Sequence, residues 1–235
     1  MLFPSDRIIL NKNDLTNGAT PLNKSIAIFS LLFLVSCSDI DDKESAMTTS
    51  TDGIHYTNEK FNMRIVKPES WHAQSVAELI ATQQMGARVM SGDDENFEAM
   101  VEASLASSLP LFGFHEFAPG TPTTVNSSIT GVAENIAVMP GIKSGCDYLY
   151  HAKQALRQSQ VDIDINDECL TEVVNGTKLS YFSTTMRFGP NTAKQKLFAC
   201  LSGDYAIAIV HTLVNKDNTE EVDAILNSLT IDCEA

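Results

Sequence analysis

Residues 205–214 read Tyr-Ala-Ile-Ala-Ile-Val-His-Thr-Leu-Val, an apolar run rich in β-branched side chains. Side chains that branch at Cβ fit the pleated surface of a sheet better than the surface of a helix, so this run favours a β-strand. Its nearly continuous apolar character indicates that the strand is central in its sheet.

The segments on either side of this strand extend the same sheet. A short strand is predicted at 170–174, and longer strands are predicted at 177–188 and 195–201. Asn175-Gly176 separates the first two, and this pair is typical of a two-residue hairpin turn because both residues tolerate positive φ. After residue 214 a last helix is predicted to begin at Thr219, with apolar side chains at helical spacing on its buried face: Val222, Ile225, Leu226 and Leu229.

The first half of the domain mixes strands and helices. A hairpin is predicted over 54–57 and 61–66, and further strands are predicted at 111–117 and 129–138. Helices are predicted from residue 76 to a C-cap at Gly92, from a cap at Asp93 or Asp94 to a stop at Pro110, and over 146–160. This order predicts an α+β domain with one mainly antiparallel sheet packed by helices.

The N-terminal region resembles a bacterial lipoprotein signal with its lipobox. Lys24 precedes a short apolar run that ends in Leu34-Val35-Ser36-Cys37. The apolar run over 26–35 is shorter than the roughly 20 residues that span a bilayer, so it indicates a cleaved signal and not a membrane span. Residues 1–36 are predicted to be the signal peptide, and the Cys37 thiol is predicted to carry the lipid. The alternative is a buried strand that happens to end in cysteine.

An acylated Cys37 would make the lipid bilayer a partner of the protein. Residues 37–52 are rich in Ser, Thr and Asp and are predicted to form a flexible tether, with the globular domain over 53–235. By resemblance to Gram-negative lipoproteins, Ser38 favours lipid anchoring in the cell outer membrane, at its periplasmic face. Residues 1–21 are polar and precede the charge of the signal, so we hypothesise that translation starts at Leu22 from a UUG codon.

The composition disfavours some classes of partner. The chain has 235 residues, of which 43% are hydrophobic, enough for the core of one ordinary domain. Its formal net charge is −14, from 16 Lys and Arg against 30 Asp and Glu. Phosphate groups repel such a balance, so nucleic acid is not expected as a partner.

Five cysteines are present, and one of them, Cys37, is assigned to the lipid. An even number that remains in an exported domain suggests disulfides. We favour the pairs Cys146–Cys169 and Cys200–Cys233, because the first brackets a helix with its following loop and the second pins the C-terminal tail to a central strand. Reduced, buried cysteines are the alternative. Metal binding by all four is not expected, because no Cys-x-x-Cys pair occurs.

The opening and the closing of the domain together resemble the PsbP-like group, which includes the DcrB-like bacterial lipoproteins. The opening residues are Tyr56-Thr57-Asn58, Phe61-Asn62-Met63-Arg64-Ile65 and the corner Pro68-Glu69-Ser70-Trp71. The closing residues are Tyr205-Ala206-Ile207-Ala208 and the helix Val222-Asp-Ala-Ile-Leu-Asn-Ser-Leu229. The resemblance implies an α/β/α sandwich with no shared catalytic residues, in a family of adaptors, assembly factors and chaperone-like binders. This chain departs from the pattern by an insertion over 72–108 and by its cysteines.

We find no motif for catalysis or for a cofactor. The segment Asp162-Ile-Asp-Ile-Asn-Asp-Glu168 resembles the start of a calcium loop, but Asp167 stands where a glycine is needed and Val173 where a bidentate glutamate is needed. No nucleophile lies beside a base in a known arrangement. No metal-ligand spacing joins the five histidines, which are His55, His72, His115, His151 and His211.

The sequence therefore predicts a membrane-anchored periplasmic lipoprotein that acts as a non-catalytic binding or assembly module of the cell envelope. Its partner is expected to be an envelope protein, and no catalytic residue, cofactor or metal is expected. Trp71 is read as a packing residue of the corner and not as a ligand-stacking residue. Two alternatives stay open. The first is a metal-dependent or hydrolytic enzyme whose residues converge only in the fold, and the second is a chaperone-like binder with an apolar groove on an exposed sheet face.

Overall fold

The computed structural model describes residues 52–118, 120–121, 126–189, 191–214 and 219–234, and the backbone of 48–49. Its helices are α2 (Val76–Ser91), α3 (Glu95–Ala106), α4 (Gly145–Gln158), α5 (Thr219–Asn227) and a short 3₁₀ turn, η1 (Glu59–Phe61). Its strands are β1 (Thr48–Thr49), β2 (His55–Asn58), β3 (Met63–Val66), β4 (His72–Ala73), β5 (Ser108–His115), β6 (Ser128–Asn135), β7 (Ile163–Ile165), β8 (Leu170–Val174), β9 (Thr177–Phe188), β10 (Asn191–Ser202) and β11 (Tyr205–Leu213). The predicted signal peptide, Cys37 and most of the predicted tether lie outside the described residues.

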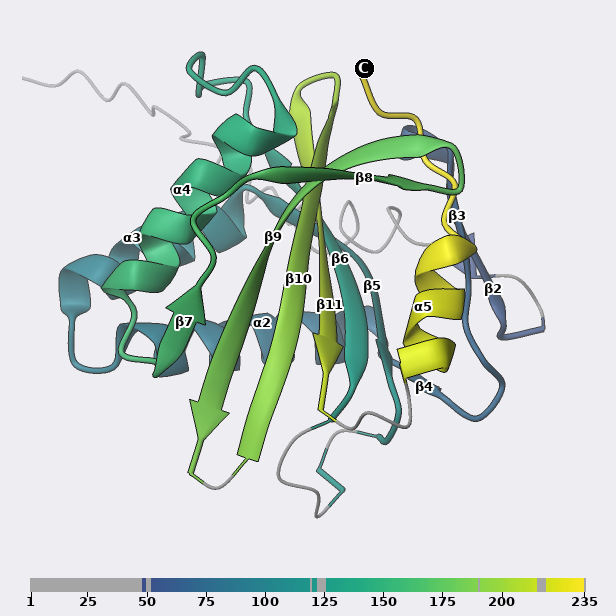
Figure 1. The fold of residues 1–235 in the computed structure, drawn as a ribbon, viewed down its shortest axis with the longest axis horizontal. Helices are drawn as coiled ribbons and strands as arrows, with labels where there is room; N and C mark the ends of the chain where they lie inside the picture. The colour runs from purple at the N-terminus through teal and green to yellow at the C-terminus, as the bar shows by residue number, and fades with distance from the viewer. Residues whose placement is uncertain are drawn as a thin grey trace, which may run out of the picture. The chain divides into compact units, whose positions relative to one another are not determined.

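The main sheet has the strand order β4-β5-β6-β11-β10-β9-β7, and β8 pairs with a separate part of β9 (Figure 1). All of these pairings are antiparallel. The strand β11 lies between β6 and β10, so the predicted central position of residues 205–214 is confirmed. The β8–β9 turn has Asn175 at φ 45° and Gly176 at φ 86°, which confirms the predicted hairpin.

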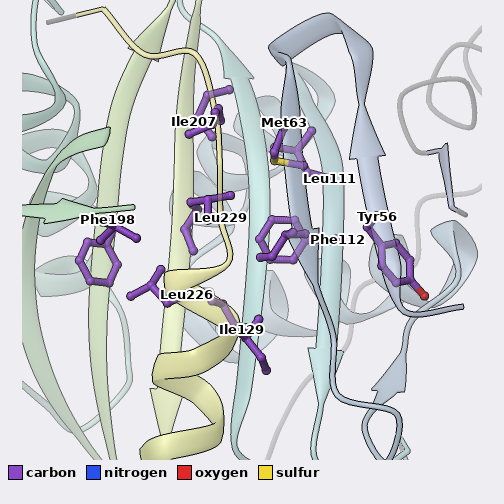
Figure 2. Packing of buried hydrophobic residues seen from close by; sticks show 14 of the residues in the cluster. Tyr56, Met63, Leu111, Phe112, Ile129, Phe198, Ile207, Leu226 and Leu229 are labelled. Atoms are coloured by element: carbon purple, nitrogen blue, oxygen red, sulfur yellow. The ribbon is translucent and has the colours of Figure 1, made fainter. Parts of the chain in front are cut away.

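One face of the main sheet packs against α5 and the hairpin of β2 and β3. Figure 2 shows Leu226 of α5 and Leu229, which follows α5, among apolar side chains of the sheet that include Ile129, Phe198 and Ile207. The indole of Trp71 is 3% exposed in the same cluster and donates a hydrogen bond to Glu221 of α5 at 2.9 Å. This burial fits the reading of Trp71 as a packing residue.

The opposite face of the sheet packs against α4, where Leu149 contacts Phe182 and Ala199 in a second cluster. Side chains alternate along β10, so Phe198 and Cys200 belong to the α5 face while Ala199 belongs to the α4 face. Helices α2 and α3 pack beside α4 over β5. The predicted α+β class, with helices on both faces of an antiparallel sheet, is confirmed.

Each helix of this second face begins at a side chain that caps it. Ser75 and Glu78 form a reciprocal capping box at the start of α2, and Gly92 ends α2 as predicted, at φ 54°. Asp94 accepts backbone hydrogen bonds from Asn96 and Phe97, which confirms the cap predicted for α3. Ser144 caps α4. These local signals fix where the helices start.

Some boundaries differ from the sequence prediction. Pro110 does not end a helix: α3 already ends at Ala106, and Pro110 is buried inside β5 next to an irregularity in the register with β6. Such an irregularity accommodates a residue that has no N–H to donate. The strand predicted over 129–138 ends at Asn135, and the short strands β4 and β7 were not predicted.

The two ends of the described domain are joined by backbone hydrogen bonds. Arg64 of β3 and Thr230, which follows α5, donate to each other's carbonyl oxygens at 2.9 Å. The N–H of Asp232 donates to Phe61 at 3.2 Å. On the other side of the hairpin, Thr48 and Thr49 pair with β2 although they fall in the predicted tether.

Candidate functional site

The four cysteines of the domain form two disulfides, Cys146–Cys169 and Cys200–Cys233, which is the pairing favoured from the sequence. Their Cα atoms are 5.9 Å and 5.8 Å apart, within the normal range for a bridge. The first ties the start of α4 to the segment before β8. The second ties the residues after α5 to β10. Both cysteine pairs therefore have a structural role, and no thiol of the domain is left for catalysis.

The acidic segment Asp162–Glu168 faces arginines. Asp162 and Asp164 both contact Arg187 of β9, the first at 3.1 Å, and Asp167 contacts Arg157 of α4. Residues 163–165 form β7, whereas the sequence predicted only a solvated loop. The carboxylates that resembled a calcium loop are thus engaged in ion pairs across the edge of the sheet.

Two of the five histidines meet across neighbouring strands. His72 of β4 is opposite His115 of β5 in the register. The Nε2 atom of His72 lies 3.4 Å from Oε1 of Glu78, and Nε2 of His115 lies 2.9 Å from Oε1 of Gln74. Burial lowers the pKa of His115 to about 4, the charge of His72 adds to this shift, and Glu78 opposes it. His115 is therefore neutral at physiological pH.

The other histidines lie apart from this pair. His55 contacts Asp52 near the start of the domain, and His151 is exposed on α4. His211 is buried on β11, with Nε2 3.9 Å from Asp223 of α5, and burial lowers its pKa. Within the described ranges, no group of three or more His, Cys, Asp and Glu side chains is arranged to hold a metal ion.

A pocket of about 560 Å³ lies over the α4 face of the sheet, between α2, α3 and α4. We call it the α3–α4 pocket. Its size is that of a site for a small organic molecule. Most of its walls are apolar, and they are built by Met90, Met100, Val101, Met139, Leu156 and Leu197. Methionine side chains are flexible and polarizable, so such walls adapt to ligands of different shape.

One carboxylate lines this apolar pocket. Glu134 of β6 accepts a hydrogen bond from the Ser104 hydroxyl of α3 at 2.7 Å and another from the Tyr148 hydroxyl of α4 at 2.8 Å. Burial raises the pKa of Tyr148 well above its usual value, and Glu134 raises it further, so this hydroxyl stays protonated and donates. The pocket is thus lined by one carboxylate, which two neutral hydroxyl donors hold in place.

The sequence does not predict that the residues of the pocket converge. Met100 and Val101 lie in the helix predicted to stop at Pro110, and Tyr148, Ala152 and Leu156 lie in the helix predicted over 146–160. The apolar faces of α3 and α4 do not close on each other completely, and the gap between them is the pocket. A signal was present in Glu134, a charged residue inside an otherwise β-prone strand, but nothing in the sequence shows what it faces.

The chaperone-like alternative predicts an apolar groove on an exposed sheet face, and both faces of the main sheet carry packed elements in the described residues. One face packs against α5 with the β2–β3 hairpin, and the other packs against α2, α3 and α4. The apolar hollow is a pocket between helices.

Among the helices of the described ranges, none is both long enough and apolar enough to cross a bilayer.

No protein-family model and no curated protein matches the sequence. Solved structures do resemble the chain. A crystal structure from Bacteroides thetaiotaomicron is 14% identical with a TM-score of 0.37, and the match covers 73% of this chain and 46% of that chain, which is less than half of its length.

Two further structures cover most of their own length. Cyanobacterial PsbP (CyanoP) from Synechocystis sp. PCC 6803 is 10% identical with a TM-score of 0.45, over 79% of this chain and 98% of that chain. LpqN of Mycobacterium tuberculosis, a protein involved in cell envelope biogenesis, is 11% identical with a TM-score of 0.40, over 72% and 83%. A PsbP protein is thus among the structures that this chain resembles, in line with the resemblance stated from the sequence.

Proposed function

We infer that the chain is a non-catalytic binding module of the cell envelope, held to a membrane by lipid on Cys37, and that it binds its ligand in the α3–α4 pocket. The observation that carries this proposal is the pocket itself, with methionine-rich walls around a single carboxylate. The two disulfides add support, because such bonds persist in oxidising compartments outside the cytosol.

The non-catalytic part of the proposal rests on how the polar side chains are used. The acidic segment at β7 pairs with arginines, the cysteines of the domain form disulfides, and His115 is held neutral against Gln74. In the pocket, Glu134 accepts hydrogen bonds from the hydroxyls of Ser104 and Tyr148, which hold it in place. This use of the polar side chains supports a binding role.

The binding role is tested with an uncharged apolar fluorophore, N-phenyl-1-naphthylamine, titrated into the purified domain. We expect saturable fluorescence enhancement for the wild type. Ala155 lines the pocket, so Ala155→Trp should fill it and abolish the enhancement. Ala103→Trp makes the same change on the exposed face of α3 and should leave binding intact. Equal binding by both variants would place the fluorophore elsewhere and contradict the proposed role of the pocket.

The membrane anchor is tested separately in cells. Mass spectrometry of the envelope fraction should find a chain that begins at an acylated Cys37. Cys37→Ser should release the protein from the membrane fraction, whereas Ser38→Ala should stay there. A full-length, unmodified chain in the cytosol would contradict the anchor but would not bear on the pocket.

A further inference from the structure

The carboxylate in the α3–α4 pocket has no basic side chain among its hydrogen-bond partners, in contrast to the carboxylates on and beside β7 and β8. Asp162 and Asp164 contact Arg187, Asp167 contacts Arg157, and Glu172 contacts Lys196. Within the described residues, Glu134 accepts hydrogen bonds from two neutral hydroxyls. No lysine or arginine is among the described residues that line the pocket. Its negative charge is therefore not neutralised by the residues around it.

The surroundings of Glu134 strengthen any interaction with a positive charge. The apolar walls exclude much of the water that would otherwise screen the charge. The two hydroxyls hold both carboxylate oxygens in fixed positions, and they come from different helices, Ser104 from α3 and Tyr148 from α4. Charge-assisted hydrogen bonds in such a setting are about twice as strong as neutral ones.

We propose that the α3–α4 pocket binds a small organic cation that carries an apolar chain, such as an alkylammonium compound. Its ammonium group pairs with the Glu134 carboxylate, and its chain lies along the walls formed by Met90, Met100 and Leu156. This inference rests on the proposed function and adds the charge and chemical class of the ligand. The remaining titratable side chain of the pocket, His151, is exposed on α4.

Charge complementarity decides between possible occupants. An anionic amphiphile such as a fatty acid would bring a second carboxylate next to Glu134, and this repulsion is costly where water is scarce. An uncharged apolar molecule would fit the walls but would leave Glu134 without a charged partner. A cation with an apolar chain satisfies both parts of the pocket.

The test compares three ligands with the same ten-carbon chain: decylammonium, decanol and decanoate, each displacing N-phenyl-1-naphthylamine. For the wild type we expect decylammonium to bind about tenfold or more tighter than decanol, and decanoate to bind weakest. Glu134→Gln keeps the size of the side chain and should weaken decylammonium by about tenfold, while the affinity for decanol stays within about twofold.

The control removes the same charge at another place. The whole chain is acidic and attracts cations in a diffuse way, so Glu102→Gln on the exposed side of α3 shows how much of the preference comes from overall charge. We expect this variant to behave as the wild type. Thermal melts of both variants show whether either substitution lowers the stability of the fold.

The outcomes separate this inference from the proposed function. Equal affinities for decylammonium and decanol, or equal losses in Glu134→Gln and Glu102→Gln, overturn the cation preference while the pocket still binds apolar ligands. Failure of all three ligands to displace the fluorophore from the pocket also overturns the inference. Absence of any fluorophore binding by the wild type overturns the proposed function with it.

Discussion

Lys67 is 5% exposed, yet it brings an ammonium group into the fold. Its Nζ atom donates to the carbonyl oxygens of Pro68 and Trp71, each at 2.6 Å. Burial lowers the pKa of Lys67, and the neighbouring Glu69 opposes this shift. The Lys67 side chain therefore stabilises the Pro68–Trp71 corner by hydrogen bonds. The corner in turn places the Trp71 indole in the core.

Lys67→Met is expected to lower the free energy of unfolding by about 1–3 kcal/mol, because the Trp71 carbonyl oxygen loses its donor and the Pro68 carbonyl oxygen keeps only the backbone N–H of Trp71. Urea unfolding followed by Trp71 fluorescence measures the loss. Lys178→Met, on the exposed side of β9, serves as the control and should change stability by no more than about 0.5 kcal/mol. A similar effect of both substitutions would show that the corner does not depend on Lys67.

His115 is expected to make stability depend on pH. Its folded pKa of about 4 lies below the ordinary value of 6.5, so the unfolded chain takes up the proton first as the pH falls. The contribution of neutral His115 to the free energy of unfolding is complete above pH 6.5 and is lost as the pH falls from 6.5 to 4. It amounts to about 3 kcal/mol at most. His115→Gln cannot take up this proton and should show a flatter stability profile over that range, measured by urea unfolding at each pH. Parallel profiles for both proteins would contradict the shift.

At the scale of the elements, the pairing of β5 with β6 depends on a residue without a side chain. A Cβ atom on Gly131 of β6 would lie 2.3 Å from Cε1 of Phe112, which is fully buried on β5. The two residues are partners in the register. The ring of Phe112 therefore occupies the space that a side chain at position 131 would take.

Gly131→Ala is expected to destabilise the domain by about 1–3 kcal/mol, because Phe112 must leave its packed position. Gly86→Ala makes the same substitution inside α2, where a Cβ meets nothing within 4 Å. This control should stabilise the domain by up to about 1 kcal/mol, since alanine favours the helix. The difference in sign between the two variants, measured by thermal or urea unfolding, is the diagnostic result.

The elements also show how far local sequence signals reach. The long strands β9 and β11, the Asn175-Gly176 turn and the caps at Gly92 and Asp94 follow from residue types that act within a few positions. The strands β4 and β7 were missed because two or three residues carry too little periodicity, and they form only where a longer strand offers them an edge. The predicted end of α3 at Pro110 was wrong, because a proline is tolerated inside β5 at the irregularity in its register with β6.

The α3–α4 pocket was out of reach of the sequence for a different reason. Its residues come from α2, α3, β6, α4 and β10, with Met139 between β6 and α4, and no one of these elements shows the gap by itself. A gap between packed faces depends on how the elements sit against each other. The two disulfides were easier to anticipate, because the four cysteines of the domain allow only three pairings.

For the molecule as a whole, the two disulfides restrict the unfolded chain in similar ways. They join residues 23 and 33 positions apart, for which the loop-entropy model gives about 3–4 kcal/mol each. Cys146→Ala with Cys169→Ala should cost about that amount in urea unfolding. Cys200→Ala with Cys233→Ala should cost more, because Cys200 is 4% exposed in the main core and alanine leaves space there. Unchanged stability in either double variant would mean that its bridge does not form in the folded protein.

The hydrogen bonds between Arg64 and Thr230 indicate that the domain can be circularly permuted. Because Thr230 and Asp232 lie beside Arg64 and Phe61, a flexible linker that spans the length of the β2–β3 hairpin can join residue 234 to residue 52. New ends can then open at the exposed Gly141, between β6 and α4. We expect such a circular permutant to keep both bridges and a cooperative unfolding transition, since every strand pairing of the main sheet is retained in it.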